Sequence, residues 1–473
     1  MAAKYFDAVI EKGIAFILIF TPLAIGTVQQ WSIAIMEIAS FIILCAWILK
    51  MASDGKVVVL KTPLFGILAA LFLLIVFQIL PLPERLMAFL SPSANNMYSA
   101  FLGDDVTMSR TISIYSGATR EELFKLLSYV AVFIVVVNHF RTKVQISRVV
   151  LTIIYMGCFL AVFAVIQKMT WNGRLYWFYP VGKGLHSDMT YIWGPYINHN
   201  HFAGYMEMAI PIGLGFLLYK LSGINSLHGL PVSRRIARYL DRKDSVYVMF
   251  LCLAVLIMSV VLFMSLSRGG IIGFTASVLF FSWMIRTRPS LRKKTGVFAL
   301  LGIITLIIVL LSGWGRIEER FQEAGEVEKM NRIDIWSDTL NIVMDFPLLG
   351  TGLGTFKNIY PQYQSDNSRF LFDHAENDYL EIVTDMGIAG FIIIIGMVSV
   401  FSHSVIKAWR KRHDNFIKCI VTAGMSSCVA IAVHSFTDFN LRIPANMMLL
   451  TVIAAITYSS VLIPTDKKYS DAI

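Results

Sequence analysis

The stretch HAENDYLEIVTDMGIAGFIIIIGMVSVF, residues 374–401, joins a polar segment directly to an apolar one. The polar part, up to Gly390, holds a histidine, an asparagine and four acidic residues, whereas the part after it holds no charged residue. Apolar runs of about 20 residues match the hydrocarbon core of a bilayer, which is about 30 Å thick. The stretch therefore predicts a membrane helix with a cluster of ionisable groups at its entrance.

Apolar runs of this kind recur along the whole chain. Of the 473 residues, 56% are hydrophobic and 15% charged, and the mean hydropathy is +0.66, which excludes an ordinary soluble domain. The predicted fold class is an all-α polytopic membrane protein, with residues 1–473 as a single membrane domain. The runs predict about twelve transmembrane helices, near residues 13–29, 31–49, 63–80, 123–138, 149–167, 202–219, 246–265, 269–285, 296–313, 387–406, 416–436 and 444–463.

Basic residues are concentrated in alternate loops. If the N-terminus lies inside, the inner segments hold 26 of the 41 lysines and arginines, and most of these inner loops are short. Because positively charged loops stay on the cytoplasmic side, both termini are predicted to be cytoplasmic. This topology and the anionic lipid of the inner leaflet account for the net charge of +10, which therefore gives no support to nucleic-acid binding.

The predicted outer side carries the long irregular segments, residues 81–122, 168–201 and 314–386. Loops of this length usually carry function. The first, which begins PLPERLMAFLSPSANNMYSAFLGDD, offers no chemistry and is interpreted as a surface lid on the bilayer. Candidate functional residues therefore come from the other two loops and from the outer turns.

Arg268 lies in SLSRGG, residues 265–270, at the outer turn between two apolar runs. An arginine in this position is costly unless it snorkels to the interface or pairs with an anion. Gly269 and Gly270 open the next predicted helix, whose N–H groups and positive dipole end would point outward and suit a phosphate. The alternative is a snorkelling arginine above a small-residue helix contact.

Arg332 begins the segment RIDIWSDTLNIVMDFPLLGTGLGTF, residues 332–356. The segment predicts an amphipathic helix, closed by Pro347 and a glycine-rich turn, because four apolar residues recur at helical spacing: Ile333, Trp336, Leu340 and Val343. The glycines are not a dinucleotide fingerprint, since no strand precedes them. Arg332 taken alone fits a solvent-facing residue, and its candidacy depends on its neighbours.

His199 and His201 lie in YINHNHFAGYMEMAIP, residues 196–211, which enters a predicted helix from outside. A spacing of two places them on different helix faces, and no further ligand follows at a metal-site spacing. They either bind sugar hydroxyls or phosphate, or form a polar cap at the interface. Glu207 lies about a turn and a half inside the same helix. A lone carboxylate facing lipid is costly, so Glu207 is predicted to face the bundle interior.

Glu376 is a candidate general base. If the chain is helical from Glu376 onward, this residue lies above one face formed by Leu380, Val383, Gly387 and Gly390, with His374 just before it. Partial shielding from water raises the proton affinity of a carboxylate, which suits a base for a sugar hydroxyl. The alternative is a hydrated helix start, capped by Asp373, with acidic residues placed favourably at the positive end of the dipole.

Together these residues form one pattern, because all are predicted at the outer leaflet or above it: Arg268, Arg332, His199, His201, Glu207, His374, Glu376, Asn377 and Asp438. The predicted inner loops are only basic. Glycosyl transfer from a lipid diphosphate requires cations beside an acid or histidine base. The reason is that the leaving diphosphate gains charge while the acceptor hydroxyl loses its proton.

The segments NHNHFAGYMEMAIP, SLSRGG, RIDIWSDTLNIVMDFPLLGTGLGTF and HAENDYLEIVTDMGIAG resemble, in order and spacing, the O-antigen ligase and O-antigen polymerase superfamily (Wzy-C), over about residues 190–400. The resemblance implies a bacterial inner-membrane glycosyltransferase: a GT-C-like helical bundle with a long periplasmic loop, residues 314–386. It implies transfer of glycan from undecaprenyl diphosphate to a glycan acceptor at the periplasmic face, without a metal and without a cofactor. Arg268 and Arg332 would hold the diphosphate, and the substrate-binding residues would be His199, His201, Glu207 and Asn377.

One position departs from the family pattern. The ligases typically place His-Asn nine residues before Gly-x-x-Gly; here Asn377, Gly387 and Gly390 match, but Glu376 takes the histidine position. The predicted base is therefore Glu376, or else His374 reaching in from the preceding turn.

The acceptor is left open by the sequence. A lipid-linked repeat would make the protein a polymerase, whereas lipid A core or a protein would make it a ligase or an oligosaccharyltransferase. Two alternatives to an enzyme remain: a polysaccharide or glycolipid transporter, which would need a polar path across the membrane, and a non-catalytic partner of a polysaccharide assembly system.

Overall fold

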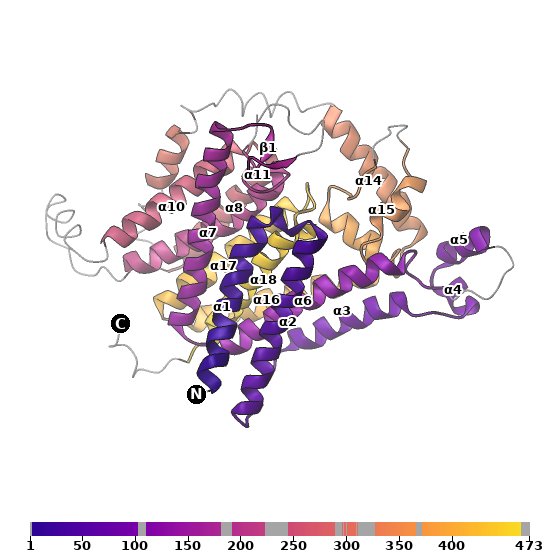
Figure 1. Cartoon of the computed structure of the whole chain (residues 1–473), viewed down its shortest axis with the longest axis horizontal. Helices are drawn as coiled ribbons and strands as arrows, with labels where there is room; N and C mark the ends of the chain where they lie inside the picture. The colour runs from indigo at the N-terminus through magenta and orange to yellow at the C-terminus, as the bar shows by residue number, and fades with distance from the viewer. Residues whose placement is uncertain are drawn as a thin grey trace.

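The computed structural model describes residues 2–102, 110–180, 192–222, 245–288, 327–365 and 371–464, together with 296, 298, 300–308 and 310 (Figure 1). Within these ranges the fold is helical apart from one short antiparallel hairpin, β1 (Arg174–Leu175) and β2 (Tyr179–Pro180). The longer helices are α1 (Ala2–Leu23), α2 (Gln30–Ser53), α3 (Pro63–Ile79), α6 (Ser116–His139), α7 (Lys143–Met169), α8 (His199–Ser222), α10 (Ser245–Met264), α11 (Arg268–Arg286), α14 (Val327–Asp345), α16 (Asp378–Lys411), α17 (Asn415–His434) and α18 (Pro444–Leu462). The short ones are α4 (Glu84–Leu90), α5 (Pro92–Leu102), α15 (Phe356–Ile359), η1 (Ile25–Thr27), η2 (Tyr360–Gln362) and η3 (Asn440–Arg442).

Nine helices of the described ranges are long and apolar enough to cross a membrane: α2, α6, α7, α8, α10, α11, α16, α17 and α18. The protein is therefore a multi-pass, all-α membrane protein, as predicted. Nine spans are confirmed rather than about twelve. Two further predicted runs form helices, but α3 has only 17 residues and α1 carries charges at Lys4, Asp7, Glu11 and Lys12. The remaining run, residues 296–313, extends beyond the described residues.

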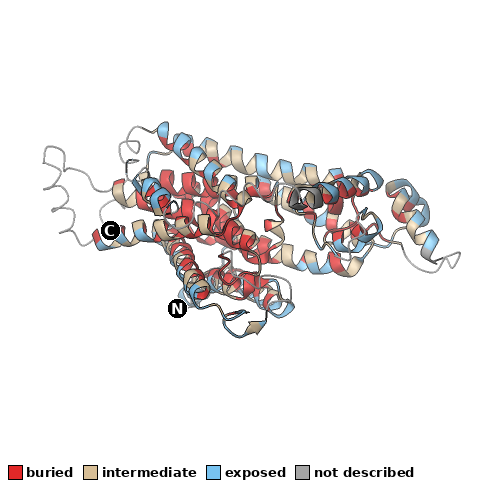
Figure 2. Ribbon diagram, turned by 90° about the horizontal axis from the view of Figure 1, so that it is seen from above, coloured by how far each residue is buried: buried red, intermediate tan, exposed pale blue. Residues whose placement is uncertain are grey.

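The centre of the bundle is α8, which contacts α7, α10, α11, α17 and α18. Its most apolar stretch is 94% buried, compared with 78% for α17 and α18 and 11% for α16. Figure 2 shows the same concentration of buried residues in the middle of the bundle. Away from this core, α3 and α6 run side by side toward α4 and α5 (Figure 1). Polar residues on α8 and α17 therefore lie in protein rather than in lipid.

α16 is interrupted at Gly387, whose φ of 62° and ψ of −169° are not helical. The turn of residues 347–354 fills this break: Thr351 N donates to Thr384 O, and Ile388 N donates to Pro347 O, both at 2.9 Å. Gly350 has a φ of 71°, and a side chain there would lie 2.4 Å from the backbone of Asp385. The glycine-rich turn therefore packs closely against the break in α16, and its hydrogen bonds hold the polar start of this helix in place.

The chain alternates between the two ends of the bundle. The starts of α8, α11, α16 and α18 and the last residue of α17 lie at one end, which we call the polar end because the candidate residues gather there. The starts of α1, α7 and α17 and the last residues of α8 and α18 lie at the opposite end. The predicted outer loops meet at the polar end, since Ile114 N donates to Thr351 O at 2.9 Å.

Candidate functional site

A small pocket at the polar end is formed by α8, α11, α14 and the end of α17. Its walls are His199, Asn200, Leu266, Arg268, Gly269, Arg332, His434 and Thr437. Three residues singled out from the sequence, His199, Arg268 and Arg332, therefore share one pocket although 133 positions separate the first from the last. Two guanidinium groups in one small pocket make it suited to an anion with several oxygens.

The position of Arg268 follows from the start of α11. The Ser267 side chain caps this helix by accepting a hydrogen bond from Gly270 N at 3.2 Å. Arg268 is thus the first residue of a helix of 19 residues, and Gly269 beside it forms part of the pocket wall. The positive end of the helix dipole and the Arg268 guanidinium therefore face the same pocket, which favours a negatively charged ligand.

Arg332 lies in the first turns of α14, and the predicted helix is confirmed there. The predicted apolar face is wrong at two of its four positions, since only Trp336 and Val343 are half-buried. Ile333 and Leu340 are exposed, and the buried side is instead formed by Ile335, Asp338, Thr339, Ile342 and Phe346. Asp338 belongs on this side because its carboxylate accepts hydrogen bonds from Tyr360 and Ser365, which a hydrophobicity pattern does not detect.

Glu376 pairs with Arg332: its Oε2 lies 3.4 Å from Arg332 Nη2. The predicted helical conformation of Glu376 is wrong, since its φ is +53° and α16 begins two residues later. Asn377, and not Asp373, caps the helix by accepting hydrogen bonds from Tyr379 N and Leu380 N. In its first turns the buried residues are Asp378, Glu381, Thr384 and Asp385, whereas Gly387 and Gly390 are buried as predicted.

The surroundings of Glu376 raise the pKa of its carboxyl group. Burial raises the pKa of this carboxyl to about 7, and the Asp438 charge adds to the rise while Arg332 opposes it. A carboxyl group with a pKa near neutral can both accept and return a proton under physiological conditions. The side chain remains 27% exposed, so a substrate can reach it.

His374 forms a second acid–base pair. Its Nδ1 lies 2.9 Å from Glu381 Oε1, and its ring stacks on Phe439 with 4.2 Å between ring centroids. Burial lowers the pKa of the imidazole, but the Glu381 carboxylate outweighs this effect and the pKa lies above its usual value. His374 is thus held in a fixed orientation, with its other nitrogen on the far side from Glu381.

Arg442 holds this pair in place. Its Nε lies 3.0 Å from Glu381 Oε1, and its Nη2 lies 2.5 Å from Asp385 Oδ2. The same Asp385 oxygen accepts a hydrogen bond from Gly354 N at 2.8 Å. A single arginine therefore connects His374, through Glu381, to the glycine-rich turn.

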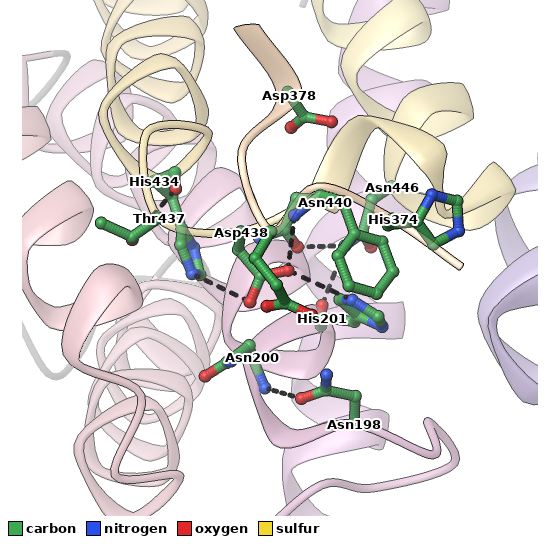
Figure 3. A network of polar contacts seen from close by, with 12 residues as sticks. Asn198, Asn200, His201, His374, Asp378, His434, Thr437, Asp438, Asn440 and Asn446 are labelled. Atoms are coloured by element: carbon green, nitrogen blue, oxygen red, sulfur yellow. Dashed lines mark hydrogen bonds and ion pairs between the residues drawn. The ribbon is translucent and has the colours of Figure 1, made fainter. Parts of the chain in front are cut away.

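A second chain of polar groups runs into the bundle (Figure 3). His201 Nε2 lies 3.3 Å from Asp438 Oδ1, Asp438 Oδ2 lies 4.0 Å from His434 Nε2, and His434 Nδ1 lies 3.0 Å from Glu207 Oε1. Burial raises the pKa of Asp438, but the neighbouring His201 and His434 hold it well below its usual range. The prediction that Glu207 faces the interior is confirmed, because its side chain is fully buried.

Asn377 occupies a structural position. Besides capping α16, its Nδ2 donates a hydrogen bond to Phe436 O at 3.1 Å. Contact with a substrate through this side chain would require breaking these bonds, and its predicted substrate role stays a prediction.

Among the described residues, no group of three or more His, Cys, Asp or Glu side chains is arranged to hold a metal ion. The predicted independence from metals and cofactors stays a prediction.

Five residues of the site were not singled out from the sequence: Asp378, Glu381, Asp385, His434 and Arg442. Two signals were available. His434 and Asp438 are four apart at the end of an apolar run, and Arg442 is the one basic residue between the predicted spans 416–436 and 444–463. Ionisable residues in such places usually mark a functional site.

The fold and the site define a multi-pass membrane protein with a pocket lined by two arginines and with ionisable side chains beside it at one end of its bundle. Residues 253–395 match the family model Wzy_C, described as O-antigen ligase, which confirms the resemblance predicted from the sequence. The match includes Arg268, Arg332, His374 and Glu376, whereas α8 and α17 lie outside it. No curated protein matches the chain.

Proposed function

We propose that this protein is a membrane glycosyltransferase that moves glycan from undecaprenyl diphosphate to a glycan acceptor. The observation that supports it best is the pocket in which Arg268, Arg332 and the start of α11 converge, with Glu376 lying 3.4 Å from Arg332. The O-antigen ligase match over residues 253–395 points to the same chemistry.

In the proposed reaction the acceptor hydroxyl attacks the anomeric carbon of the donor sugar. The bond from that carbon to the diphosphate oxygen breaks, so undecaprenyl diphosphate leaves with an additional negative charge. Arg268, Arg332 and the α11 dipole stabilise this charge where it develops. The proton of the acceptor hydroxyl passes to the base.

Glu376 is proposed as that base. Its pKa of about 7 and its partial exposure suit proton transfer, and its contact with Arg332 places it beside the leaving group. His374 is the alternative base, oriented by Glu381. His199 and His201, on the first turn of α8, are proposed to contact the substrate.

The proposed location is the bacterial inner membrane. The polar end faces the periplasm, where donor and acceptor meet, and both termini are cytoplasmic. The acceptor is lipid A core in a ligase or a lipid-linked repeat in a polymerase. Membrane lipids surround the bundle through exposed apolar side chains of helices such as α2 and α16.

The test uses the purified full-length protein in liposomes that contain undecaprenyl-diphosphate oligosaccharide. Free undecaprenyl diphosphate and product mass are measured with and without candidate acceptors. Elongated lipid-linked glycan without an added acceptor would identify a polymerase, whereas release of the diphosphate only with lipid A core would identify a ligase. No release with folded protein and the native repeat unit would contradict the proposal and favour the transport or partner alternatives.

A further inference from the structure

His434 forms part of the wall of the diphosphate pocket but lies outside the residues that match the family model. It is the last residue of α17, and its side chain is only 1% exposed. A buried imidazole without a hydrogen-bond partner would destabilise the bundle, because removing a polar group from water is costly unless another group bonds to it. Its two ring nitrogens have different surroundings: Nδ1 contacts Glu207, and Nε2 lies beside the pocket wall at Gly269.

The Nδ1 side is occupied by Glu207. The two groups are 3.0 Å apart, and Glu207 is fully buried in the central helix α8. A buried carboxylate accepts a hydrogen bond from the imidazole N–H, so this contact fixes both the ring orientation and the proton on Nδ1. The Nε2 edge of the ring is consequently directed away from Glu207.

The Nε2 edge lies against the first turn of α11. A Cβ atom added at Gly269 would be 2.4 Å from His434 Cδ2 and 2.7 Å from His434 Nε2, so only glycine leaves room for the ring there. Gly269 and His434 both belong to the pocket wall, next to Arg268. The nearest acidic group on this edge, Asp438 Oδ2, is 4.0 Å from Nε2, which is beyond hydrogen-bond distance.

Two carboxylates, Glu207 from α8 and Asp438 from the turn after α17, face the imidazole from opposite sides. A ring with an acidic side chain on each side can act as an N–H donor at both nitrogens. The arrangement therefore presents an N–H group to the pocket from a ring held at its other nitrogen.

We propose that His434 donates an Nε2–H hydrogen bond to the diphosphate of the lipid-linked substrate, as a third donor group beside Arg268 and Arg332, with Glu207 as its positioning residue. This inference rests on the proposed function. It accounts for the buried carboxylate of Glu207 in the centre of the bundle, and for the glycine that follows Arg268 at position 269.

The test measures binding of undecaprenyl diphosphate to the full-length protein in nanodiscs, with undecaprenol as the reference ligand. His434→Asn keeps an N–H near Glu207 but removes the donor at Nε2, because the asparagine amide superimposes on Nδ1. We expect it to weaken undecaprenyl-diphosphate binding by roughly tenfold or more, as for hydrogen bonds to charged groups. The melting temperature should change little. The matched control is His403→Asn, the same change at an exposed position of α16, with no effect on binding.

A second variant keeps the proposal testable if His434→Asn does not fold. Gly269→Ala should displace the His434 ring and weaken binding in the same way, whereas Gly66→Ala, at a glycine with open space around it, should not. Unchanged binding in both His434→Asn and Gly269→Ala would overturn the inference. If the wild-type protein binds undecaprenyl diphosphate no better than undecaprenol, the proposed function itself fails.

Discussion

The two ends of the bundle hold charged side chains at similar distances but in different surroundings. At the opposite end, Lys143 Nζ lies 2.5 Å from Asp414 Oδ2, and the two side chains are 39% and 30% exposed. At the polar end, Arg442 Nη2 also lies 2.5 Å from Asp385 Oδ2, but the Asp385 side chain is fully buried. An exposed pair is screened by water, whereas buried charges are costly unless every partner is in place. The comparison predicts that replacing one partner of a pair has a much larger effect at the polar end than at the opposite end.

The largest expected effect comes from the base at the polar end. Glu376→Gln should lower turnover by roughly 10²–10⁴-fold, since the amide cannot accept the acceptor proton. His374→Ala should be impaired less. Turnover is measured in the liposome assay, with the exposed Glu121→Gln at the start of α6 as a control. The reverse ranking would assign the base to His374.

Replacing Arg442 measures how much the buried ion pairs contribute to the free energy of unfolding. Arg442→Ala leaves Glu381 and Asp385 buried without their common cation, so we expect a loss of about 3–5 kcal/mol in the free energy of unfolding. Turnover should fall as well, because Glu381 no longer holds His374 in one orientation. Chemical denaturation in detergent measures the first effect. A change below about 1 kcal/mol would mean that the buried network contributes no more than a surface pair.

Arg268 tests the anion pocket without changing the buried network. Arg268→Ala should lower turnover by roughly 10²–10³-fold, the usual cost of removing one donor to a developing charge. Folded protein should remain in the membrane, because the N-terminal cap of α11 comes from Ser267. Arg120→Ala, at an exposed position of α6, is the control. Normal turnover in the Arg268 variant would remove the argument for a diphosphate site.

The pH dependence of kcat/KM distinguishes Glu376 from His374 as the base. Glu376 must be deprotonated to act as a base, and its pKa is about 7. The ratio kcat/KM should therefore fall about tenfold per pH unit below that value and level off above it. In Glu376→Gln, this acid limb should disappear from the residual activity. An unchanged limb in that variant would mean that another group sets it.

The sequence predicts the general location of the site better than its internal contacts. Arg268 and Arg332 are each placed at the end of a predicted apolar or amphipathic segment, and the structure brings both into one pocket. The inward face of α16 was predicted only in part: Gly387 and Gly390 are buried, but in the first turns the buried residues are Asp378, Glu381, Thr384 and Asp385. Glu381 lies inward because it pairs with His374 and Arg442, and a hydrophobicity pattern does not detect such contacts.

Contacts between distant segments were beyond the reach of local patterns. Glu207 and His434 are 227 positions apart, and they meet only because α8 packs against α17. Helical periodicity indicates that a polar residue avoids lipid but does not indicate its partner. The break at Gly387 likewise depends on a turn that docks from residues 347–354.

The smallest expected effect belongs to the opposite end and completes the comparison. Lys143→Ala removes one partner of an exposed pair, and we expect a change of about 0–1 kcal/mol in the free energy of unfolding. Asp414 is not stranded by this change, because its carboxylate also caps α17 by accepting hydrogen bonds from Phe416 N and Ile417 N. Turnover should stay at the wild-type level. The same denaturation experiment that measures Arg442→Ala measures this variant, so the two values can be compared directly. If Lys143→Ala lowered the free energy of unfolding as much as Arg442→Ala, burial would not explain a difference between the two pairs. The comparison between the two ends would then be wrong.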